Sequence, residues 1–248
     1  MTLNPERPRI IGIAGGTGAG KVVLVEELCR RHGPVAVLDL DAYYVDRTGM
    51  PPEARARLNF DEPAAIEIGL LLEHVGRLSA GRRVDKPVYS FASHTRIGVA
   101  PVAPAPLVIV EGLFTLWWPE LRARLDVAVY VDGSPDVRLA RRLRRDVRER
   151  GRDVEAVLAQ YLATVRPMHE RYVEPTRAFA DVVIANDEEL EPAVRALCEA
   201  AGKVAGETDG AAGDDGRPLR SRPGSQQDAA AGGRSAREGS GPHRARGG

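Results

Sequence analysis

The chain has 248 residues, of which 43% are hydrophobic, enough to enclose one sizeable core. Lys+Arg (35) and Asp+Glu (35) balance to a formal net charge of zero, which argues against attachment to nucleic acid or membranes through bulk charge. Only Cys29 and Cys198 are present, no apolar run reaches membrane-spanning length, and residues 1–8 do not resemble a signal peptide. We therefore expect a soluble, cytoplasmic protein without a membrane partner or a specific nucleic-acid partner.

Short apolar runs alternate with stretches of helical periodicity through most of the chain. The runs are continuously apolar, as in strands buried on both faces, and they span 10–14, 35–40, 107–110, 127–131 and 182–185. The helical stretches span 22–32, 64–78, 137–150, 154–166 and 188–201. This alternation predicts an α/β fold, in which helices cover both faces of a parallel sheet.

The first apolar run leads directly into a glycine-rich segment, GGTGAGKV, at 15–22. A strand, a GxxxxGK loop and a helix in this order are typical of a phosphate-binding P-loop. Lys21 would reach the β- and γ-phosphates, and the backbone N–H groups of the loop would surround the phosphate oxygens. The loop residues are Gly15, Gly16, Thr17, Gly18, Ala19 and Gly20. The alternative is a dinucleotide-binding turn, but its GxGxxG pattern is not met.

The residue after the P-loop lysine departs from the motif. Ser or Thr is usual there because its hydroxyl ligates Mg²⁺, whereas this chain has Val22, which offers no lone pair. Mg²⁺ habitually keeps several waters, so a water can take the place of the hydroxyl. Without such a replacement, we expect metal affinity or activity to fall by at least about 10–100-fold.

Acidic residues end two of the apolar runs. Asp39 and Asp41 close the run at 35–40, and Glu111 follows the run at 107–110. The carboxyl ends of parallel strands face the ligand crevice of such sheets. Strand ends are often polar in any fold, but beside a P-loop Glu111 becomes a candidate Mg²⁺ ligand. Asp41 is a second candidate ligand and could accept the proton of an attacking hydroxyl.

Between residues 81 and 106 the pattern breaks into short extended pieces, which predict a β-hairpin inserted into the α/β core. Tyr89 and Phe91 alternate there and His94 follows. These side chains could bind a flat ligand. Alternatively, the two aromatics are core residues and the histidine is a satisfied loop residue.

The helical stretch at 137–150 is rich in arginine. Arg138, Arg142 and Arg145 have i, i+4, i+7 spacing and so share one helix face. Fixed guanidiniums stabilise the charge of a phosphoryl group in transfer. An equally weighted alternative is a solvated helix with salt bridges to Asp136, Asp146 and Glu149.

From residue 203 to 248 the chain contains mainly Gly, Ala, Ser, Arg, Asp and Pro, too few bulky apolar residues to offset the entropy of ordering. This composition predicts a disordered tail after a single domain at 1–202. The Arg-rich end at 234–248 could touch nucleic acid or acidic partners, but a solvated tail is the favoured interpretation.

Several separated motifs together resemble the uridine kinase (uridine–cytidine kinase) family of P-loop kinases over about residues 9–201. They are IGIAGGTGAGK, LDLDAYY, LNFDEP, KPVYSFASHTR, VIVEG, RRLRRDVRERGRD and QYLATVRPMHERYVEPTRAFADVVI. The resemblance implies a P-loop NTPase-type sheet, a nucleoside-binding hairpin at 81–106 and a helical lid at 137–166.

The resemblance also implies roles for individual residues. Asp41 matches the base that deprotonates the ribose 5′-hydroxyl, and Glu111 matches a Mg²⁺ ligand, as does the position of Val22. Asp61 and Arg142 match residues that bind the ribose hydroxyls. Tyr89 and His94 match the pair that recognises the pyrimidine, with Phe60 and Phe91 nearby as stacking residues. The residues that match a lid over the phosphates are Arg145, Arg150 and Arg152.

The implied activity is phosphoryl transfer from ATP or GTP, with Mg²⁺, to the 5′-hydroxyl of uridine or cytidine in pyrimidine salvage, by a homo-oligomer such as a tetramer. Ser90 and Ala42 depart from the Asp and the hydroxyl residue that are common in the family at these positions. Two alternatives remain open: a P-loop kinase for another small alcohol, and a weakly active nucleotide-binding regulatory protein, which Val22 motivates.

Overall fold

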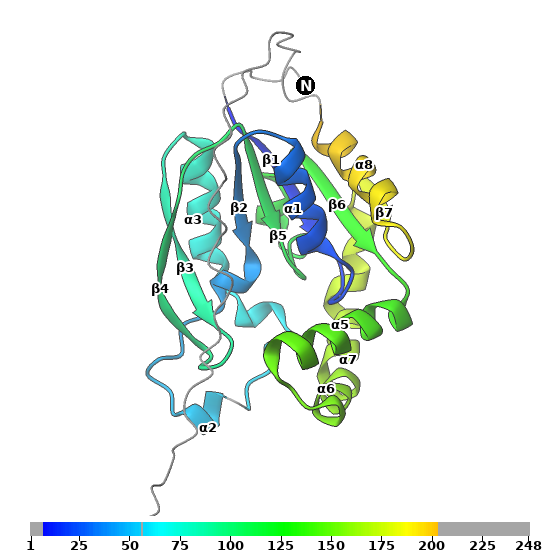
Figure 1. The fold of residues 1–248 in the computed structure, drawn as a ribbon. Coiled ribbons are helices and arrows are strands. Elements are labelled where there is room, and N and C mark those ends of the chain that lie inside the picture. Colours follow the sequence, from blue (N-terminus) through cyan, green and yellow to red (C-terminus); the bar gives the residue numbers. More distant parts are fainter. Residues whose placement is uncertain (1–6, 56, 203–248) are drawn as a thin grey trace, which may run out of the picture. The chain divides into compact units, whose positions relative to one another are not determined.

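The computed structural model describes residues 7–55 and 57–202, so the predicted tail at 203–248 lies outside the described residues. A five-stranded parallel sheet organises this part of the chain (Figure 1). Its order is β2-β5-β1-β6-β7, with β1 at Arg9–Ala14, β2 at Val35–Asp39, β5 at Leu107–Glu111, β6 at Val127–Asp132 and β7 at Val182–Ala185. The predicted α/β fold with a parallel sheet is confirmed.

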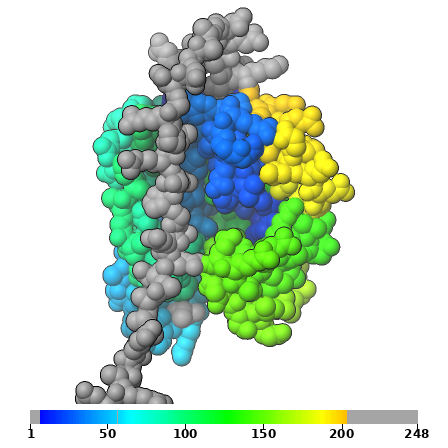
Figure 2. Space-filling view, in the orientation of Figure 1, coloured from blue at the N-terminus to red at the C-terminus, as the bar shows by residue number. Residues whose placement is uncertain are grey.

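Helices cover both faces of the sheet, as predicted. Side chains alternate between the faces along β1: Ile11 and Ile13 enter one core, and Ile10 and Ala14 enter the other. Helix α1 (Lys21–Arg31) and helix α8 (Leu190–Ala201) close the first core and lie side by side in Figure 2, in blue and yellow. Helix α3 (Ile68–Ser79) closes the second.

Strand order brings three loops to one edge of the sheet. β1 is hydrogen-bonded to both β5 and β6, and β2 lies beyond β5. Ile13 and Asp39 are both register partners of Glu111, so β1, β2 and β5 end level with one another. Because these strands are parallel, the segments that follow them emerge together, in the position where open α/β sheets bind ligands.

The predicted hairpin forms a separate antiparallel sheet of β3 (Val84–Ser90) and β4 (Thr95–Val102). The register shifts between Val88 and Tyr89, which re-aims the side chains after the bulge. Lys86 is buried and forms an ion pair with Asp39 at the end of β2, which ties the hairpin to the edge of the main sheet.

The arginine-rich helix is α5 (Pro135–Arg150), which begins with proline in its first turn and is followed by Gly151 in the left-handed conformation, φ 59°. Helix α6 (Val154–Gln160) follows, and the helical path then continues to Phe179, beyond the predicted end at 166. This extension comprises π-helix (Tyr161–Val165), α7 (Arg166–Met168), π-helix (His169–Val173) and 3-10 helix (Glu174–Phe179). The wide π-turns continue the helical path around Pro167, whose missing N–H would interrupt an α-helix.

Short helical elements make up the remaining connections: 3-10 helices at Leu40–Tyr43 and Pro63–Ala65, α2 (Pro52–Arg55) and α4 (Pro119–Arg122). None of the helices in the described part of the chain combines the length and apolarity that a membrane span requires.

Candidate active site

The P-loop connects the end of β1 to the N-terminus of α1. Lys21 is buried, and its Nζ donates hydrogen bonds to the carbonyl oxygens of Gly15 (2.9 Å) and Gly16 (3.2 Å). Gly18 has φ +76°, and a Cβ there would collide with the backbone carbonyl oxygen of Arg138. The loop therefore needs glycine both for its conformation and for its close contact with α5. The start of α1 directs its positive dipole end toward any anion bound by the loop.

Two carboxylates face the lysine across this edge. Asp41 lies in the 3-10 helix that follows β2, and Glu111 is the last residue of β5. Among the described residues, neither carboxylate has a hydrogen bond or an ion pair within 4.0 Å. Burial raises the pKa of Glu111 to about 7, with Lys21 opposing the rise and Asp41 adding to it.

Asp41 is exposed to solvent, although nearby protein partly shields its carboxylate from water. This surrounding protein and the neighbouring Asp39 raise the pKa of Asp41, while Lys21 and Arg150 oppose the increase. Burial lowers the pKa of Lys21, and Glu111 and Asp41 act against this. Lys21 thus interacts with both carboxylates, and Asp41 acts on Glu111, so the structure brings the predicted base, metal ligand and P-loop lysine together.

The donor set suits Mg²⁺ as it is usually bound beside phosphates. No group of three or more His, Cys, Asp or Glu side chains in residues 7–55 and 57–202 forms a ready metal site. Mg²⁺ typically takes one or two carboxylates, substrate phosphates and waters, and the unpaired carboxylates of Glu111 and Asp41 match that requirement. Val22 is 56% exposed and contributes no oxygen.

Aromatic side chains of the hairpin and of the segment after β2 form a cluster of ring contacts. The rings of Phe60 and His94 stack with centroids 4.6 Å apart and an interplanar angle of 11°. Tyr44 links them to the hairpin, because its ring lies 5.0 Å from that of Tyr89 and 6.3 Å from that of Phe91. The hydroxyl of Tyr89 is buried without a hydrogen-bond partner among the described residues. A buried, unpaired donor beside stacked rings is suited to a flat polar ligand.

His94 adopts φ 53°, a left-handed conformation that is uncommon for histidine, and burial lowers its pKa. A neutral imidazole can both donate and accept a hydrogen bond. Phe91 is 40% exposed and lies under the guanidinium of Arg150, whose Cζ is 4.6 Å from the ring centroid. This exposure shows that Phe91 is not a core aromatic.

The carboxylate of Asp61 accepts a hydrogen bond from the helical segment that follows α6. Thr164 Oγ1 donates to Asp61 Oδ2 at 3.0 Å, and Arg142 donates to Gln160 Oε1 at 3.0 Å and to Thr17 Oγ1 at 3.2 Å. Arg142 therefore connects the P-loop to the helical path that also bonds Asp61. Sequence reasoning did not identify Gln160 or Thr164, although their i, i+4 spacing in a helical stretch was a usable signal.

Two arginines of α5 do not lie on a solvated face, although others on the same helix are exposed. Arg138 and Arg142 are buried, and of the three acidic residues proposed as salt-bridge partners only Asp146 pairs with arginine among the described residues. Asp146 also pairs with Arg145, Arg150 and Arg152. The solvated-face alternative therefore does not describe Arg138 and Arg142, whereas its ion pair with Asp146 is present, because four guanidiniums share this one buried carboxylate.

Sequence reasoning missed Asn186 and His169, which contact the P-loop and the neighbouring Arg138 respectively. Asn186, just after β7, donates to the carbonyl oxygen of Ala19 at 2.7 Å. Arg138 donates to the carbonyl oxygen of Gly133 (2.9 Å), and its Nη2 lies 3.1 Å from His169 Nε2. Burial and the Arg138 charge lower the pKa of His169 to about 4. No local pattern marks these contacts, which join distant segments.

Comparison with known proteins matches this architecture. A model of the "Phosphoribulokinase / Uridine kinase family" matches residues 10–189. The chain is 46% identical over 179 residues to a uridine kinase from Chloroflexus aggregans, covering 71% of this chain and 86% of that protein. It is 44% identical over 182 residues to a uridine kinase from Geobacillus kaustophilus, covering 72% and 86% respectively.

Solved structures with the same fold are more distant in sequence. A putative fructose transport system kinase from Silicibacter sp. gives a TM-score of 0.60 at 21% identity, covering 74% of this chain and 92% of that one. Phosphoribulokinase from Rhodobacter spheroides gives 0.56 at 16% identity, covering 72% and 70%. The fold is therefore that of the P-loop kinases, and the chain belongs to the phosphoribulokinase/uridine kinase family.

Proposed function

We propose that this protein transfers the γ-phosphoryl group of ATP or GTP to the 5′-hydroxyl of uridine or cytidine. The observation that carries the proposal is the meeting of Lys21 with the unpaired carboxylates of Asp41 and Glu111 at one edge of the sheet. Phosphoryl transfer needs little covalent help from the protein, so positioning and charge stabilisation at such an edge are the main requirements.

Asp41 accepts the proton of the ribose hydroxyl as that oxygen attacks phosphorus, and the nucleoside diphosphate leaves with the electron pair. Lys21 and the arginines Arg145 and Arg150 stabilise the charge of the transferred group. Bound Mg²⁺, held by Glu111 and Asp41, would neutralise phosphate charge.

Arg152 interacts electrostatically with Asp61 and His94, so it also faces the acceptor. Closure of the 137–166 lid over the site would exclude water.

An acceptor screen tests the identity of the substrate. We expect uridine and cytidine to be phosphorylated in preference to small alcohols such as glycerate or pantothenate. We expect His94→Ala to raise the KM for uridine by about 10-fold or more, because a buried polar contact worth about 1.5 kcal/mol or more is lost. Steady-state kinetics with each acceptor provide the measurement, and Ser93→Ala is the control on the same hairpin. Equal turnover of a small alcohol, unaffected by His94→Ala, would point to a different acceptor.

The Val22 position gives a second test. Val22→Thr restores the hydroxyl of the motif on the first turn of α1, so we expect activity at limiting Mg²⁺ to rise by about 10-fold. Magnesium titrations of the rate provide the measurement, with Val23→Thr, on the adjacent exposed position, as the control. If both variants have the same magnesium dependence as the native chain, a hydroxyl at this position is irrelevant. Nucleotide binding by calorimetry without turnover in either protein would favour a regulatory nucleotide-binding role, the second candidate.

A further inference from the structure

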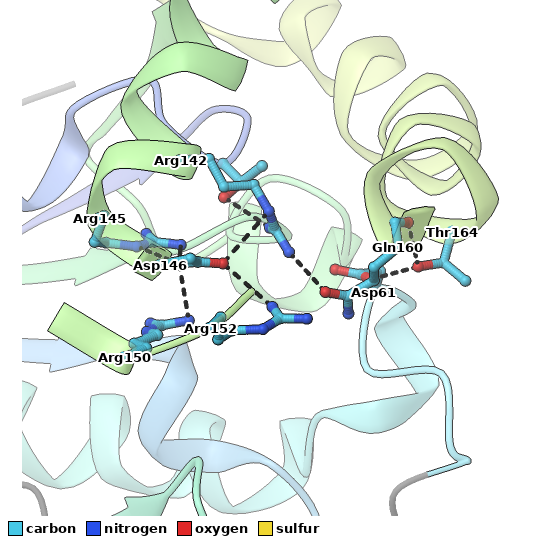
Figure 3. Close-up of polar contacts among 9 residues, drawn as sticks. Asp61, Arg142, Arg145, Asp146, Arg150, Arg152, Gln160 and Thr164 are labelled. Atoms are coloured by element: carbon cyan, nitrogen blue, oxygen red, sulfur yellow. Dashed lines mark hydrogen bonds and ion pairs between the residues drawn. The ribbon is translucent and has the colours of Figure 1, made fainter. Parts of the chain in front are cut away.

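One carboxylate at the centre of the arginine-rich segment has no role in the reaction described above. Asp146 is fully buried at 0% exposure, yet four guanidiniums surround it (Figure 3). Its oxygens lie 2.9 Å from Arg145 Nη2, 3.2 Å from Arg152 Nη1, 3.6 Å from Arg150 Nη1 and 3.7 Å from Arg142 Nε.

The backbone of the same residue shapes the turn after α5. The carbonyl oxygen of Asp146 accepts hydrogen bonds from the N–H of Gly151 and from that of Arg152 at 3.0 Å. These bonds end the helix and turn the chain back, which brings Arg150 and Arg152 toward the side chain that also binds Arg142 and Arg145. One residue thus fixes both the path of this segment and the direction of its cations.

The charges in this group do not balance. Four guanidiniums and one carboxylate leave a formal excess of three positive charges (four minus one). Burial lowers the pKa of Arg142, and the neighbouring cations Arg145 and Arg152 add to this effect by repulsion. Asp61 acts on Arg142 and Arg152, and Asp41 acts on Arg150, so these carboxylates offset part of the excess. The positive charge that remains favours the binding of an anion.

The arginines face the candidate site, and Asp146 does not. Arg145 senses the charges of Lys21 and Asp41, Arg150 lies over Phe91, and Arg142 reaches Thr17 in the P-loop. Asp146 has no exposed surface with which to touch a substrate. Its influence on the reaction must therefore pass through the guanidiniums that it holds.

We propose that Asp146 is a positioning residue that holds four arginines in place, so that Arg145, Arg150 and Arg152 form a preorganised receptor for the phosphates of the donor. The proposal rests on the proposed function, because it assigns these arginines to the transferred group. Preorganised cations cost little reorganisation when charge develops, whereas flexible arginines would have to be ordered during the reaction.

Titration of ATP into Asp146→Asn tests the proposal, because the two possible roles of Asp146 predict opposite changes in ATP affinity. If Asp146 acted only as a negative charge, its removal would increase the positive excess and tighten ATP binding. A positioning role predicts the opposite: binding at least about 10-fold weaker, equivalent to the loss of one charged hydrogen bond. Glu149→Gln is the matched control, because it makes the same charge change on the same helix at an exposed residue without an ion pair among the described residues. Tighter or unchanged binding by Asp146→Asn overturns the proposal.

Turnover provides a second readout that a purely structural role would not move. We expect Asp146→Asn to lower kcat by about 100-fold, as misplaced groups can, and to have little further effect in an Arg145→Gln background. An additive double-mutant cycle contradicts the proposal. Asp146→Glu keeps the charge but moves the oxygens, so a lowered kcat in this variant supports the positioning role even if Asp146→Asn does not fold. If the native chain phosphorylates no acceptor, the proposed function is wrong. The ATP titration still tests the role of Asp146 separately, because it does not depend on turnover.

Discussion

Asp41→Asn is expected to lower kcat by about 10²- to 10⁴-fold, the range typical of a lost general base. The amide keeps the size of the side chain but cannot accept the proton of the attacking hydroxyl. Because Asp41 has no hydrogen bond or ion pair among the described residues, its substitution leaves no partner unsatisfied, and we expect the thermal midpoint to remain near that of the native chain. Single-turnover kinetics with saturating ATP and uridine isolate the chemical step.

The control for this change is Asp136→Asn, the same chemical substitution at an exposed residue in the first turn of α5. We expect it to retain native kcat. If Asp41→Asn retained more than about a tenth of the native rate with folding intact, Asp41 would not be the base, since even modest bases contribute about 100-fold.

Lys21→Met is expected to lower kcat by about 10²- to 10³-fold, comparable to the removal of one preorganised donor from a developing anion. Methionine keeps the long stem of the side chain but removes the ammonium that the carbonyl oxygens of Gly15 and Gly16 now orient. We also expect weaker ATP binding, because the cation is present in both the ground state and the transition state.

Rate measurements on Lys21→Met should be paired with Arg148→Met, which removes an exposed cation from α5. Native turnover in Arg148→Met and a large loss in Lys21→Met would locate the effect at the P-loop. Similar small losses in both variants would mean that overall charge, rather than a specific contact with phosphate, accounts for the role of the lysine.

Much of the site architecture was predictable because it follows from local periodicity and strand order. The apolar runs mark strands buried on both faces, and parallel strands deliver their carboxyl ends to one edge. That geometry brings Lys21, Asp41 and Glu111 together without any knowledge of side-chain packing. The glycine pattern and its position between a strand and a helix predicted the P-loop for the same reason.

The surroundings of these residues could not be predicted because they depend on contacts between distant segments. The stack of Phe60 on His94 joins a loop to a hairpin, and Thr164 reaches Asp61 from a π-helix that no simple periodicity marks. For α5, i, i+4 spacing identified a shared face but not whether that face meets water or protein. Only the tertiary structure reveals Asp146 as the common partner of four arginines.

We expect one nucleoside hydroxyl to be phosphorylated at the place where Lys21 and Asp41 meet. The most direct measurement incubates the purified chain with γ-labelled ATP, uridine and Mg²⁺ or Mn²⁺, and identifies the labelled product by chromatography and phosphorus NMR. We expect label in uridine 5′-monophosphate, with 5′-deoxyuridine unreactive. Absence of labelled nucleotide under both metals, or label on a 2′- or 3′-hydroxyl, would contradict this expectation.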